Sequence, residues 1–297
     1  MIDIRLKVFN SVAHNLSFTK ASKELYISQP AISKHIQELE HEYKTRLFDR
    51  MGNHIQLTRS GQLLLDHCEK ILQLYQQMNF EMNALQKKYS GELRIGASTT
   101  ISQYVIPEYL AKLLQTYPDL SVSMFSGNSQ EIESELIKGR IDIGLVEGNI
   151  HQPELKYTPF VKDELVAIVS KDNPLATRDE ITLEELKKQP LVIREIGSGT
   201  LDVIEYYLHQ HDIHLSDLQI VMHFGTTEGI KQFVKKSNSM GIVSIRSISS
   251  ELLRGEFKVI ELKGVRFERT FSIVEKYGTL TGPAKMIKDS ITKSYNL

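Results

Sequence analysis

Residues 17–40 read SFTKASKELYISQPAISKHIQELE, and this stretch predicts two short helices joined by a tight turn. In the first helix, which we expect to end near Leu25, Ala21 and Leu25 lie one turn apart on the inward face. Ser28 follows the turn and is a natural N-cap. It begins a second helix that we expect to reach Glu40.

The second helix is expected to present a polar surface over its first half. Ile32, Ile36 and Leu39 recur at helical spacing and form its inward face. The side chains left outward are polar or cationic: Gln29, Ser33, Lys34 and Gln37. Pro30 is tolerated in the first turn, because its missing N–H would have no partner there. Two short helices with such a surface are typical of a helix-turn-helix that enters the major groove of DNA.

The residues on either side complete a small winged domain over residues 1–60. An opening helix has an inward face that consists of Leu6, Val8, Phe9, Val12 and Ala13. Further on, residues 47–50 and 54–57 alternate around a turn at Gly52-Asn53, which predicts a two-stranded wing. Thr58-Arg59-Ser60-Gly61 then closes the unit and can cap a long helix.

The whole chain has the composition of a globular protein, with 297 residues of which 41% are hydrophobic and 25% charged. This length favours two or three domains. The one cysteine, Cys68, excludes an intrachain disulfide and suits a reducing compartment. The N-terminus does not resemble a signal peptide, and the longest apolar runs, such as residues 165–169, are too short to span a membrane. We therefore expect a cytoplasmic protein with no membrane partner.

The net charge of −1 does not by itself indicate nucleic-acid binding, but the charge is unevenly distributed. Residues 1–60 carry nine Lys and Arg against six Asp and Glu, a net +3, which leaves −4 for the rest. A positive first domain has the sign needed to approach phosphates.

The first domain resembles the DNA-binding domain of the LysR-type transcriptional regulators. The matching residues are Phe18-Thr19-Lys20-Ala21-Ser22, Leu25, Ser28-Gln29-Pro30-Ala31-Ile32-Ser33, Ile36, Leu39-Glu40, Leu47-Phe48-Asp49-Arg50, Leu57-Thr58 and Gly61. The chain length and the α/β remainder are also similar to that family. Ser22 stands where the family commonly has a second Ala, and Lys34 replaces a frequent Arg, so the bidentate fork that Arg offers to guanine is lost.

This resemblance implies which residues contact double-stranded promoter DNA. The groove contacts would come from the surface that starts at Ser28: Gln29, Pro30, Ser33 and Lys34. The phosphate contacts would come from Thr19, Lys20, Arg50, Thr58 and Arg59. Amide, hydroxyl and ammonium groups on the first half of a helix can reach base edges, which agrees with this assignment. The alternative, a structural three-helix unit with a solvated face, is disfavoured by the wing.

A heptad pattern follows the first domain over residues 61–89. Apolar residues recur at steps of four and three, at Leu64, Cys68, Ile71, Tyr75, Met78, Met82, Leu85 and Tyr89. This seam predicts a linker helix that forms a coiled coil and so makes the chain a homodimer. An amphipathic helix packed on its own domain would satisfy the same spacing. The resemblance implies a dimer too, and often a dimer of dimers, that is, a homotetramer.

Cys68 lies on this seam, where either a redox switch or a buried core thiol is conceivable. No Lys or Arg obviously activates the thiol, and no second cysteine could resolve an oxidised form. A core thiol is therefore favoured.

From Gly91 onward, short strand-like runs alternate with amphipathic segments, as in an α/β domain. Residues 93–97 predict a strand that ends at Ser98-Thr99-Thr100, followed by a helix with Ile106, Leu110 and Leu113-Leu114 facing inward. A similar junction joins the strand 191–193 to Gly197-Ser198-Gly199-Thr200 and another helix. Hydroxyls and free N–H groups at a strand-to-helix junction make a good anion site.

A second pair of junctions supports an internal two-fold plan. Residues 127–132 and 225–230 both resemble turns that cap a helix after a strand. The segment 225–230 includes Thr226 and Thr227. Two α/β lobes with similar edges predict a ligand cleft between them. An ordinary helix cap is the rival explanation for any one of these hydroxyls.

The resemblance extends to the effector domain of the same family, whose fold is similar to periplasmic binding proteins. It implies an effector domain at 90–297, with one lobe at 91–161 and 268–297 and the other at 162–267. It also implies that Ser98, Thr99 and Thr100 face Gly197, Ser198, Gly199 and Thr200 across the cleft, with Thr226 and Thr227 nearby. These hydroxyls and Arg194 indicate a small anion, similar to a carboxylate, sulfate or phosphate. Leu201 stands where the family often has Arg.

No arrangement of residues predicts an enzyme. The motifs of the nucleophile elbow, the phosphate loop, the dinucleotide fingerprint and the zinc-protease helix do not occur. His209, His211, Asp212 and His214 have the wrong spacing for a metal site on one helical face. We therefore expect an α+β multidomain regulator with no metal or cofactor, which acts with RNA polymerase. The alternative is a cytosolic small-molecule receptor without a transcriptional role, against which the winged helix-turn-helix argues.

Overall fold

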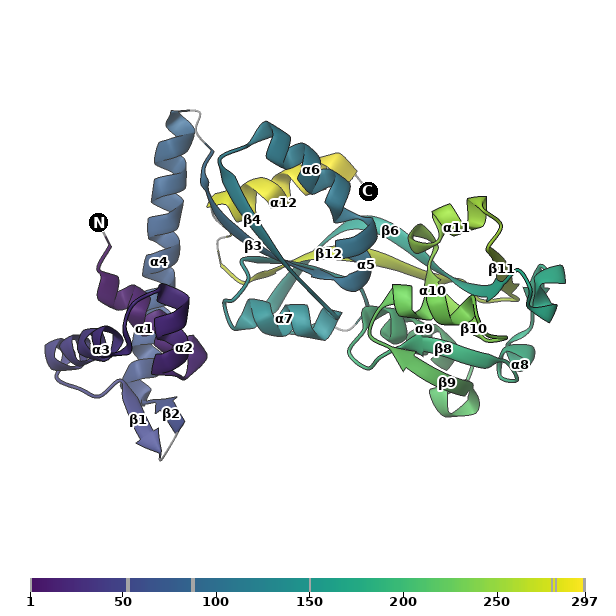
Figure 1. The fold of residues 1–297 in the computed structure, drawn as a ribbon, viewed down its shortest axis with the longest axis horizontal. Coiled ribbons are helices and arrows are strands. Elements are labelled where there is room, and N and C mark those ends of the chain that lie inside the picture. Colours follow the sequence, from purple (N-terminus) through teal and green to yellow (C-terminus); the bar gives the residue numbers. More distant parts are fainter. Residues whose placement is uncertain are drawn as a thin grey trace. The chain divides into compact units, whose positions relative to one another are not determined.

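The computed structural model describes residues 2–51, 54–86, 89–149, 151–278, 280 and 282–295. The turn predicted at Gly52-Asn53 and the side chain of Arg50 lie outside the described residues. The chain divides into two compact units, residues 1–89 and 90–297, whose elements are labelled in Figure 1.

The first unit is a helix-turn-helix with a wing. Its elements are α1 (Ile4–Asn15), α2 (Phe18–Leu25), α3 (Gln29–Tyr43), β1 (Phe48–Met51), β2 (His54–Leu57) and α4 (Arg59–Leu85). The hydroxyls of Ser17 and Ser28 accept hydrogen bonds from the N–H groups of Lys20 and Ala31, and so cap α2 and α3. Strands β1 and β2 pair antiparallel. The helices and the wing predicted from the sequence are thus confirmed, and α3 extends one turn beyond the predicted end.

Helix α4 is fastened to the winged domain at its N-terminal end. The Thr58 hydroxyl accepts from the N–H of Gly61 at 2.9 Å and donates to the carbonyl of Arg46 at 2.7 Å. A Cβ on Gly61 would lie 2.1 Å from the carbonyl oxygen of Leu47, so only glycine permits this close packing. The helix ends at Leu85, so Tyr89, which the heptad had placed on it, lies beyond the helix.

Cys68 does not lie on an exposed seam, which corrects the heptad prediction at this position. Its side chain is buried in the core of the first unit, and its thiol donates to the carbonyl of Leu6 at 3.2 Å. Burial raises the pKa of the Cys68 thiol to about 12. Leu64 also packs against this core, because the first turns of α4 must cover α1. The core-thiol interpretation is therefore the one that the structure supports.

The second unit consists of two lobes that share a sheet. The first lobe has β3 (Gly91–Ser98), α5 (Thr99–Tyr104), α6 (Ile106–Thr116), β4 (Leu120–Gly127), α7 (Ser129–Ile137), β5 (Ile143–Val146) and α12 (Gly282–Tyr295). The second has η1 (Pro174–Thr177), β7 (Glu180–Ile181), α8 (Leu183–Leu186), β8 (Pro190–Arg194), α9 (Gly199–His209), η2 (Leu215–Asp217), β9 (Gln219–Phe224), α10 (Thr227–Val234), β10 (Met240–Ser244), η3 (Ile245–Ser247), α11 (Ser249–Leu253) and β11 (Phe257–Leu262). Strands β6 (Leu155–Ser170) and β12 (Phe267–Lys276) run from one lobe into the other (Figure 1).

The sheet explains how the lobes are joined. Its strand order is β4-β3-β5-β12-β6-β10-β8-β9, with β11 paired to β6 and to β7. Strands β6 and β12 pair antiparallel from Leu165 opposite Phe267 to Leu155 opposite Lys276, with a bulge between Phe271 and Ser272. On either side of this ladder, β3 is parallel to β4 and β5, and β8 is parallel to β9 and β10. The helix N-termini that follow β3 and β8 therefore lie at the carboxyl ends of parallel strands, where ligands of such sheets bind.

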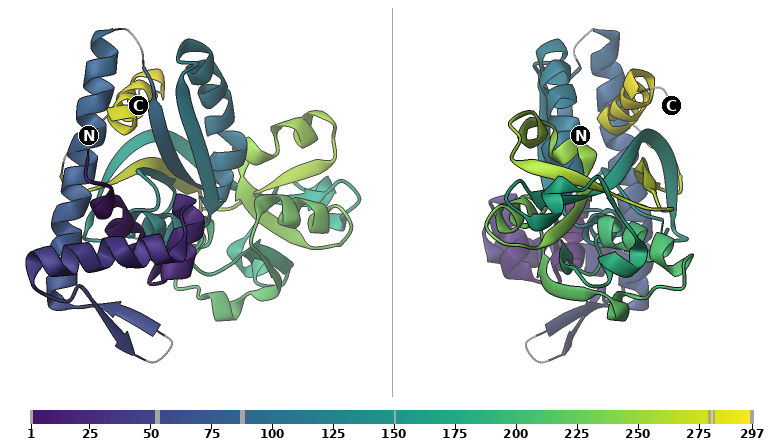
Figure 2. Two further views of the ribbon diagram at one scale, coloured as in Figure 1. Left: turned by 60° about the vertical axis from the view of Figure 1, so that its left-hand side comes forward. Right: turned by 90° about the vertical axis from the view of Figure 1, so that its right-hand side faces the viewer.

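Each lobe has helices on both faces of its part of the sheet (Figures 1 and 2). In the first lobe α6 and α12 cover one face and α7 the other, and in the second α9 and α10 do the same. Ile106 and Leu113 of α6 are buried as predicted, but Leu114 is 38% exposed, because adjacent helical residues point about 100° apart. Within the described part of the chain, no helix is both long enough and apolar enough to cross a lipid bilayer.

Candidate functional site

The first half of α3 presents the polar surface predicted from the sequence. Gln29, Lys34 and Gln37 are exposed, and Ser33 is half-buried. Lys34 keeps 75% of its side chain exposed and lies 4.0 Å from Glu38, one turn along. The Ser28 hydroxyl is 3.4 Å from the N–H of Ala31, so it serves the helix cap first. This surface can therefore offer amide, hydroxyl and ammonium donors to base edges.

The residues expected near phosphates have two different roles in the structure. Thr19, Lys20 and Arg59 are exposed at the starts of α2 and α4. The Thr58 hydroxyl is occupied by the α4 cap and by the Arg46 carbonyl, so its role is structural. Glu40 was missed by the sequence reasoning: its Oε1 accepts from the N–H groups of Leu47 and Phe48 and so fixes the wing to α3.

The hydroxyls predicted for the effector site divide into buried groups and helix caps. Ser98, Thr99 and Thr100 are buried where β3 meets α5, and Ser198 and Thr200 are buried at the start of α9. Gly197 and Gly199 lie on the same turn. Thr226 is exposed and caps α10 by accepting from Gly229, while Thr227 is buried next to it. The structure thus brings both junctions to the edge between the lobes.

Arg194 is not a free cation for an anionic ligand, which corrects its predicted role. The residue is 1% exposed. Its guanidinium donates to both oxygens of Glu195 at 2.8 and 2.9 Å and to the carbonyls of Phe224 and Gly225. It also donates to the hydroxyl of Thr99 in the first lobe at 2.8 Å. A neighbouring carboxylate therefore neutralises its charge, and the side chain links the lobes.

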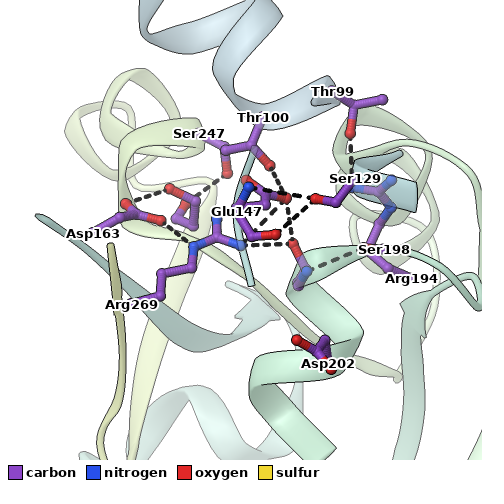
Figure 3. Close-up of polar contacts among 12 residues, drawn as sticks. Thr99, Thr100, Ser129, Glu147, Asp163, Arg194, Ser198, Asp202, Ser247 and Arg269 are labelled. Atoms are coloured by element: carbon purple, nitrogen blue, oxygen red, sulfur yellow. Dashed lines mark hydrogen bonds and ion pairs between the residues drawn. The ribbon is translucent and has the colours of Figure 1, made fainter. Parts of the chain in front are cut away.

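A buried cluster of three charged side chains was not predicted. Arg269 on β12 is 2.7 Å from Asp163 on β6, measured from Nε to Oδ2. Its Nη1 lies 3.3 Å from Oε1 of Glu147, which follows β5. All three side chains are at most 1% exposed. Figure 3 shows Arg269 between Asp163 and Glu147. The Ser244 hydroxyl donates to Asp163 at 2.8 Å, and Arg246 approaches the same carboxylate at 3.5 Å.

Two of the predicted hydroxyls converge on Glu147. Thr100 of the first lobe and Thr200 of the second each donate to Oε1 at 3.1 Å. Thr200 also accepts from Arg269 at 2.9 Å. Ser129 fixes the backbone of Glu147 by donating to its carbonyl at 2.7 Å. The Glu147 carboxylate is thus held from both lobes (Figure 3).

Glycine lets the two lobes approach here. A Cβ on Gly199 would lie 1.9 Å from the carbonyl oxygen of Glu147. The N–H of Gln130 donates to the carbonyl of Gly197 at 3.2 Å, and the N–H of Asn149 donates to Asp202 at 2.7 Å. Backbone contacts across the edge therefore depend on the Gly197-Ser198-Gly199 turn.

Three buried polar atoms at this edge have no hydrogen-bond partner among the described residues. They are the Ser98 hydroxyl, Oε2 of Glu147 and Nη2 of Arg269. A buried polar atom without a partner is costly, so such atoms indicate a position where a ligand or water completes the bonding.

A second polar contact joins the lobes away from this cluster. The Tyr104 hydroxyl of α5 donates to Glu228 of α10, and burial together with this carboxylate raises the pKa of Tyr104. Lys231 is buried beneath them and is 2.7 Å from Glu251. The tyrosine therefore remains a neutral donor at physiological pH.

The histidine cluster has no metal-binding geometry in the described part of the chain. The rings of His209 and His214 meet edge to face with centroids 4.5 Å apart. Among the described residues, no three His, Cys, Asp or Glu side chains are grouped so as to hold a metal ion.

Two sequence families match the chain in succession. The family described as "Bacterial regulatory helix-turn-helix protein, lysR family" matches residues 4–62, and the "LysR substrate binding domain" matches residues 86–285. The chain therefore belongs to the LysR family of bacterial regulators. It is a DNA-binding transcriptional regulator with an effector-binding domain, and a receptor without a transcriptional role is set aside.

Known proteins of this family are similar along most of the chain. The regulator CysL of Bacillus subtilis is 32% identical over 269 residues, covering 91% of this chain and 89% of CysL. A full-length OxyR variant from Pseudomonas aeruginosa has a TM-score of 0.74 at 18% identity, covering 99% of this chain and 97% of OxyR. The regulatory domain of Synechocystis CcmR, solved with 2-PG, has a TM-score of 0.64 at 25% identity, covering 70% of this chain and 98% of that domain. The OxyR likeness supports the fold, and the CysL match supports membership of the family.

Proposed function

We propose that the effector of this regulator is a small anion held between the two lobes of the second unit. The observation that carries the proposal is the convergence of Thr100 and Thr200, one from each lobe, on a single carboxylate oxygen. Hydroxyls and N–H groups at helix starts favour a negative charge at this point. The similar regulatory domain of CcmR was solved in complex with 2-PG, which supports a small ligand for this domain.

The test of the effector proposal is a thermal-shift panel of small carboxylates and phosphate esters, with 2-PG included. An anion that binds should raise the melting temperature of the wild type, because binding to the native state alone stabilises it. The T100V and T200V variants, which keep the side-chain shape, should lose that rise. If an active anion stabilised both variants as much as the wild type, the site would lie elsewhere.

We propose further that α3 enters the major groove. Gln29, Ser33 and Lys34 would contact base edges, with Ser28 and Pro30 setting the helix start. Thr19, Lys20, Arg50 and Arg59 would contact phosphates, with Thr58 positioning Arg59 through the cap. Affinity should then fall steeply as salt is raised. Sequencing the genomic fragments that the protein retains would identify the promoters.

Dimerisation would use the exposed part of α4. Ile71, Met78, Met82 and Leu85 form an exposed apolar stripe, and Leu85 is 81% exposed. Tyr75 is half-buried beside this stripe. A helix with such a stripe needs a partner, which supports a homodimer or homotetramer. Analytical ultracentrifugation of an M78E/M82E variant should show dissociation.

The division of labour would follow three segments. Residues 1–60 would bind DNA, residues 61–89 would dimerise, and residues 90–297 would bind the effector. Within the last segment, residues 91–161 and 268–297 would form one lobe and residues 162–267 the other. The two separate clusters of buried apolar residues support this division. The protein would act without catalysis, in the cytoplasm where bacterial promoters lie.

Effector binding would alter transcription by shifting a population. A ligand changes the balance of two states only through its differential affinity for them. Closure of the lobes on the effector would favour one arrangement of the subunits, and with it one mode of contact with RNA polymerase. A footprint of the promoter that changed on adding the effector would support this step.

A further inference from the structure

The position of the Glu147 carboxylate decides how an anion can enter the site. Thr100 and Thr200 donate to the same oxygen, Oε1, at 3.1 Å, and the guanidinium of Arg269 lies 3.3 Å from it. These donors come from both lobes and surround one carboxylate. They are the groups that the anionic end of an effector would need.

We propose that Glu147 is an internal ligand of this regulator: its carboxylate occupies the anion position, and an effector binds by displacing it. The inference rests on the proposed function and deepens it, since it assigns Arg269 as the cation that the effector meets. The class of effector is then a small acid whose carboxylate replaces that of Glu147.

The pairing of Glu147 with Arg269 is incomplete, which makes it replaceable. A bidentate pair would use two oxygens and two nitrogens in parallel. Here only one N–O contact forms, while Oε2 of Glu147 and Nη2 of Arg269 stay buried without a partner among the described residues. A free carboxylate, which has no chain to constrain it, can meet Arg269 with both oxygens.

Arg269 stays in position when Glu147 leaves. Its Nε is held by Asp163 at 2.7 Å, and Asp163 is held in turn by the Ser244 hydroxyl at 2.8 Å. The Glu147 backbone is also fixed, because Ser129 donates to its carbonyl at 2.7 Å. Only the Glu147 side chain therefore has to move for the exchange.

The charges require exchange rather than addition. Arg269 already faces the carboxylates of Glu147 and Asp163, all at most 1% exposed. Arg246 also lies 3.5 Å from Asp163, so two guanidinium groups already match these two carboxylates. A third carboxylate would be buried without a countercharge, which is strongly unfavourable. Displacement of Glu147 keeps the number of carboxylates in the cluster unchanged. Because the effector must compete with the Glu147 carboxylate, this residue sets the effector concentration at which binding occurs.

The test is rescue of the E147A variant of the full chain by free acetate. Acetate should enter the vacated position and raise the melting temperature of E147A by roughly 2–5 °C at about 100 mM. Chloride at the same ionic strength and neutral acetamide should not. Wild type should respond little, because its own carboxylate competes. E147A/T100V, which lacks one donor, should lose the acetate response.

A second variant covers the case in which E147A does not fold. E147Q keeps the side-chain volume but has no charge to expel, so acetate should stabilise it more than wild type. The proposal is overturned if acetate stabilises neither variant beyond chloride. Acetate could fail to stabilise E147A and E147Q while T100V abolishes the response of the chain to an active anion. In that case the proposed effector site stands, and the proposal that Glu147 is an internal ligand is wrong. If acetate rescues E147A but no anion acts on wild type, the effector class is wrong instead.

Discussion

The two sites proposed for this protein are built in opposite ways. The proposed DNA-binding surface is exposed and comes from one stretch of α3, with Lys34 75% exposed. The proposed effector site is buried and joins Thr100, Glu147, Asp163 and Arg269, which come from distant parts of the chain. The first surface can change without affecting the fold, whereas the second is part of what holds the lobes together.

The largest test of this difference is removal of Arg269. R269A leaves Glu147 buried without its cation and Asp163 with only the longer contact to Arg246, which should cost about 3–5 kcal/mol of unfolding free energy. Urea unfolding measures it. The matched control is K34A. Removal of this exposed ammonium group should leave the free energy of unfolding unchanged. A loss below about 1 kcal/mol in R269A would show that the cluster is hydrated and not structural.

The next effect concerns the close approach at Gly199. G199A places a Cβ 1.9 Å from the carbonyl of Glu147 and should destabilise the second unit by about 1–3 kcal/mol while weakening the effector response. G225A is the control, since its Cβ would meet no atom within 4 Å. Calorimetry measures the melting temperatures of G199A and G225A. Equal values for the two variants would contradict the close packing described at Gly199.

A smaller effect is expected from the exposed surface of α3. Q29A/S33A should reduce discrimination between promoter and random DNA by roughly 10-fold with no change in melting temperature, because both side chains lie outside the core and are proposed to contact base edges. K20A should instead weaken binding to all sequences alike. Fluorescence anisotropy with both duplexes measures this. Unchanged selectivity in the double variant would refute the groove assignment.

The smallest expected effect is a pH dependence from Glu133 on α7. Burial raises the pKa of Glu133 in the native state, although Tyr157 donates to its carboxylate at 2.7 Å. The native state then binds more protons than the unfolded chain, so this residue makes stability fall as pH rises from the ordinary glutamate pKa through the raised one. E133Q should remove that slope in urea unfolding at several pH values.

Glu135 on the same helix supplies a control of opposite sign. Its hydrogen bonds to Arg140 lower the pKa of its carboxyl, so its contribution is lost as pH falls through that lowered pKa. E135Q should therefore flatten the acid side of the profile. Identical profiles for E133Q and wild type would show that Glu133 is not buried in solution.

Much of the first unit could be predicted from the sequence because its signals are local. Caps such as Ser28, the inward faces of α2 and α3 and the wing strands depend on residues within a few positions of one another. The heptad was misleading at Cys68, since the same spacing serves a helix that packs on its own domain. Whether this part of α4 packs on its own domain or on a second chain depends on the position of α1, and the heptad spacing does not reveal that position.

The proposed effector site was only half predictable from the sequence. The junctions at Thr100 and Thr200 follow strands and could be found from hydroxyls near expected helix starts. The predicted role of Arg194 is wrong because its guanidinium pairs with the adjacent Glu195 and with distant carbonyls of the loop before α10, which the sequence does not place beside it. Glu147 had a signal, a carboxylate directly after the apolar run 143–146, but Arg269 becomes its partner only through the pairing of β5 with β12.

The close contact between Gly61 and the backbone of Leu47 has a mechanical consequence. Because Gly61 rests on the Leu47 carbonyl and Thr58 ties Arg46 to α4, the winged domain and the first turns of α4 move as one lever. Helix α4 has 27 residues, which gives an arm of about 40 Å. A rotation of about 5° at the far end would then displace the winged domain by roughly 3 Å, comparable to one base-pair step along the duplex.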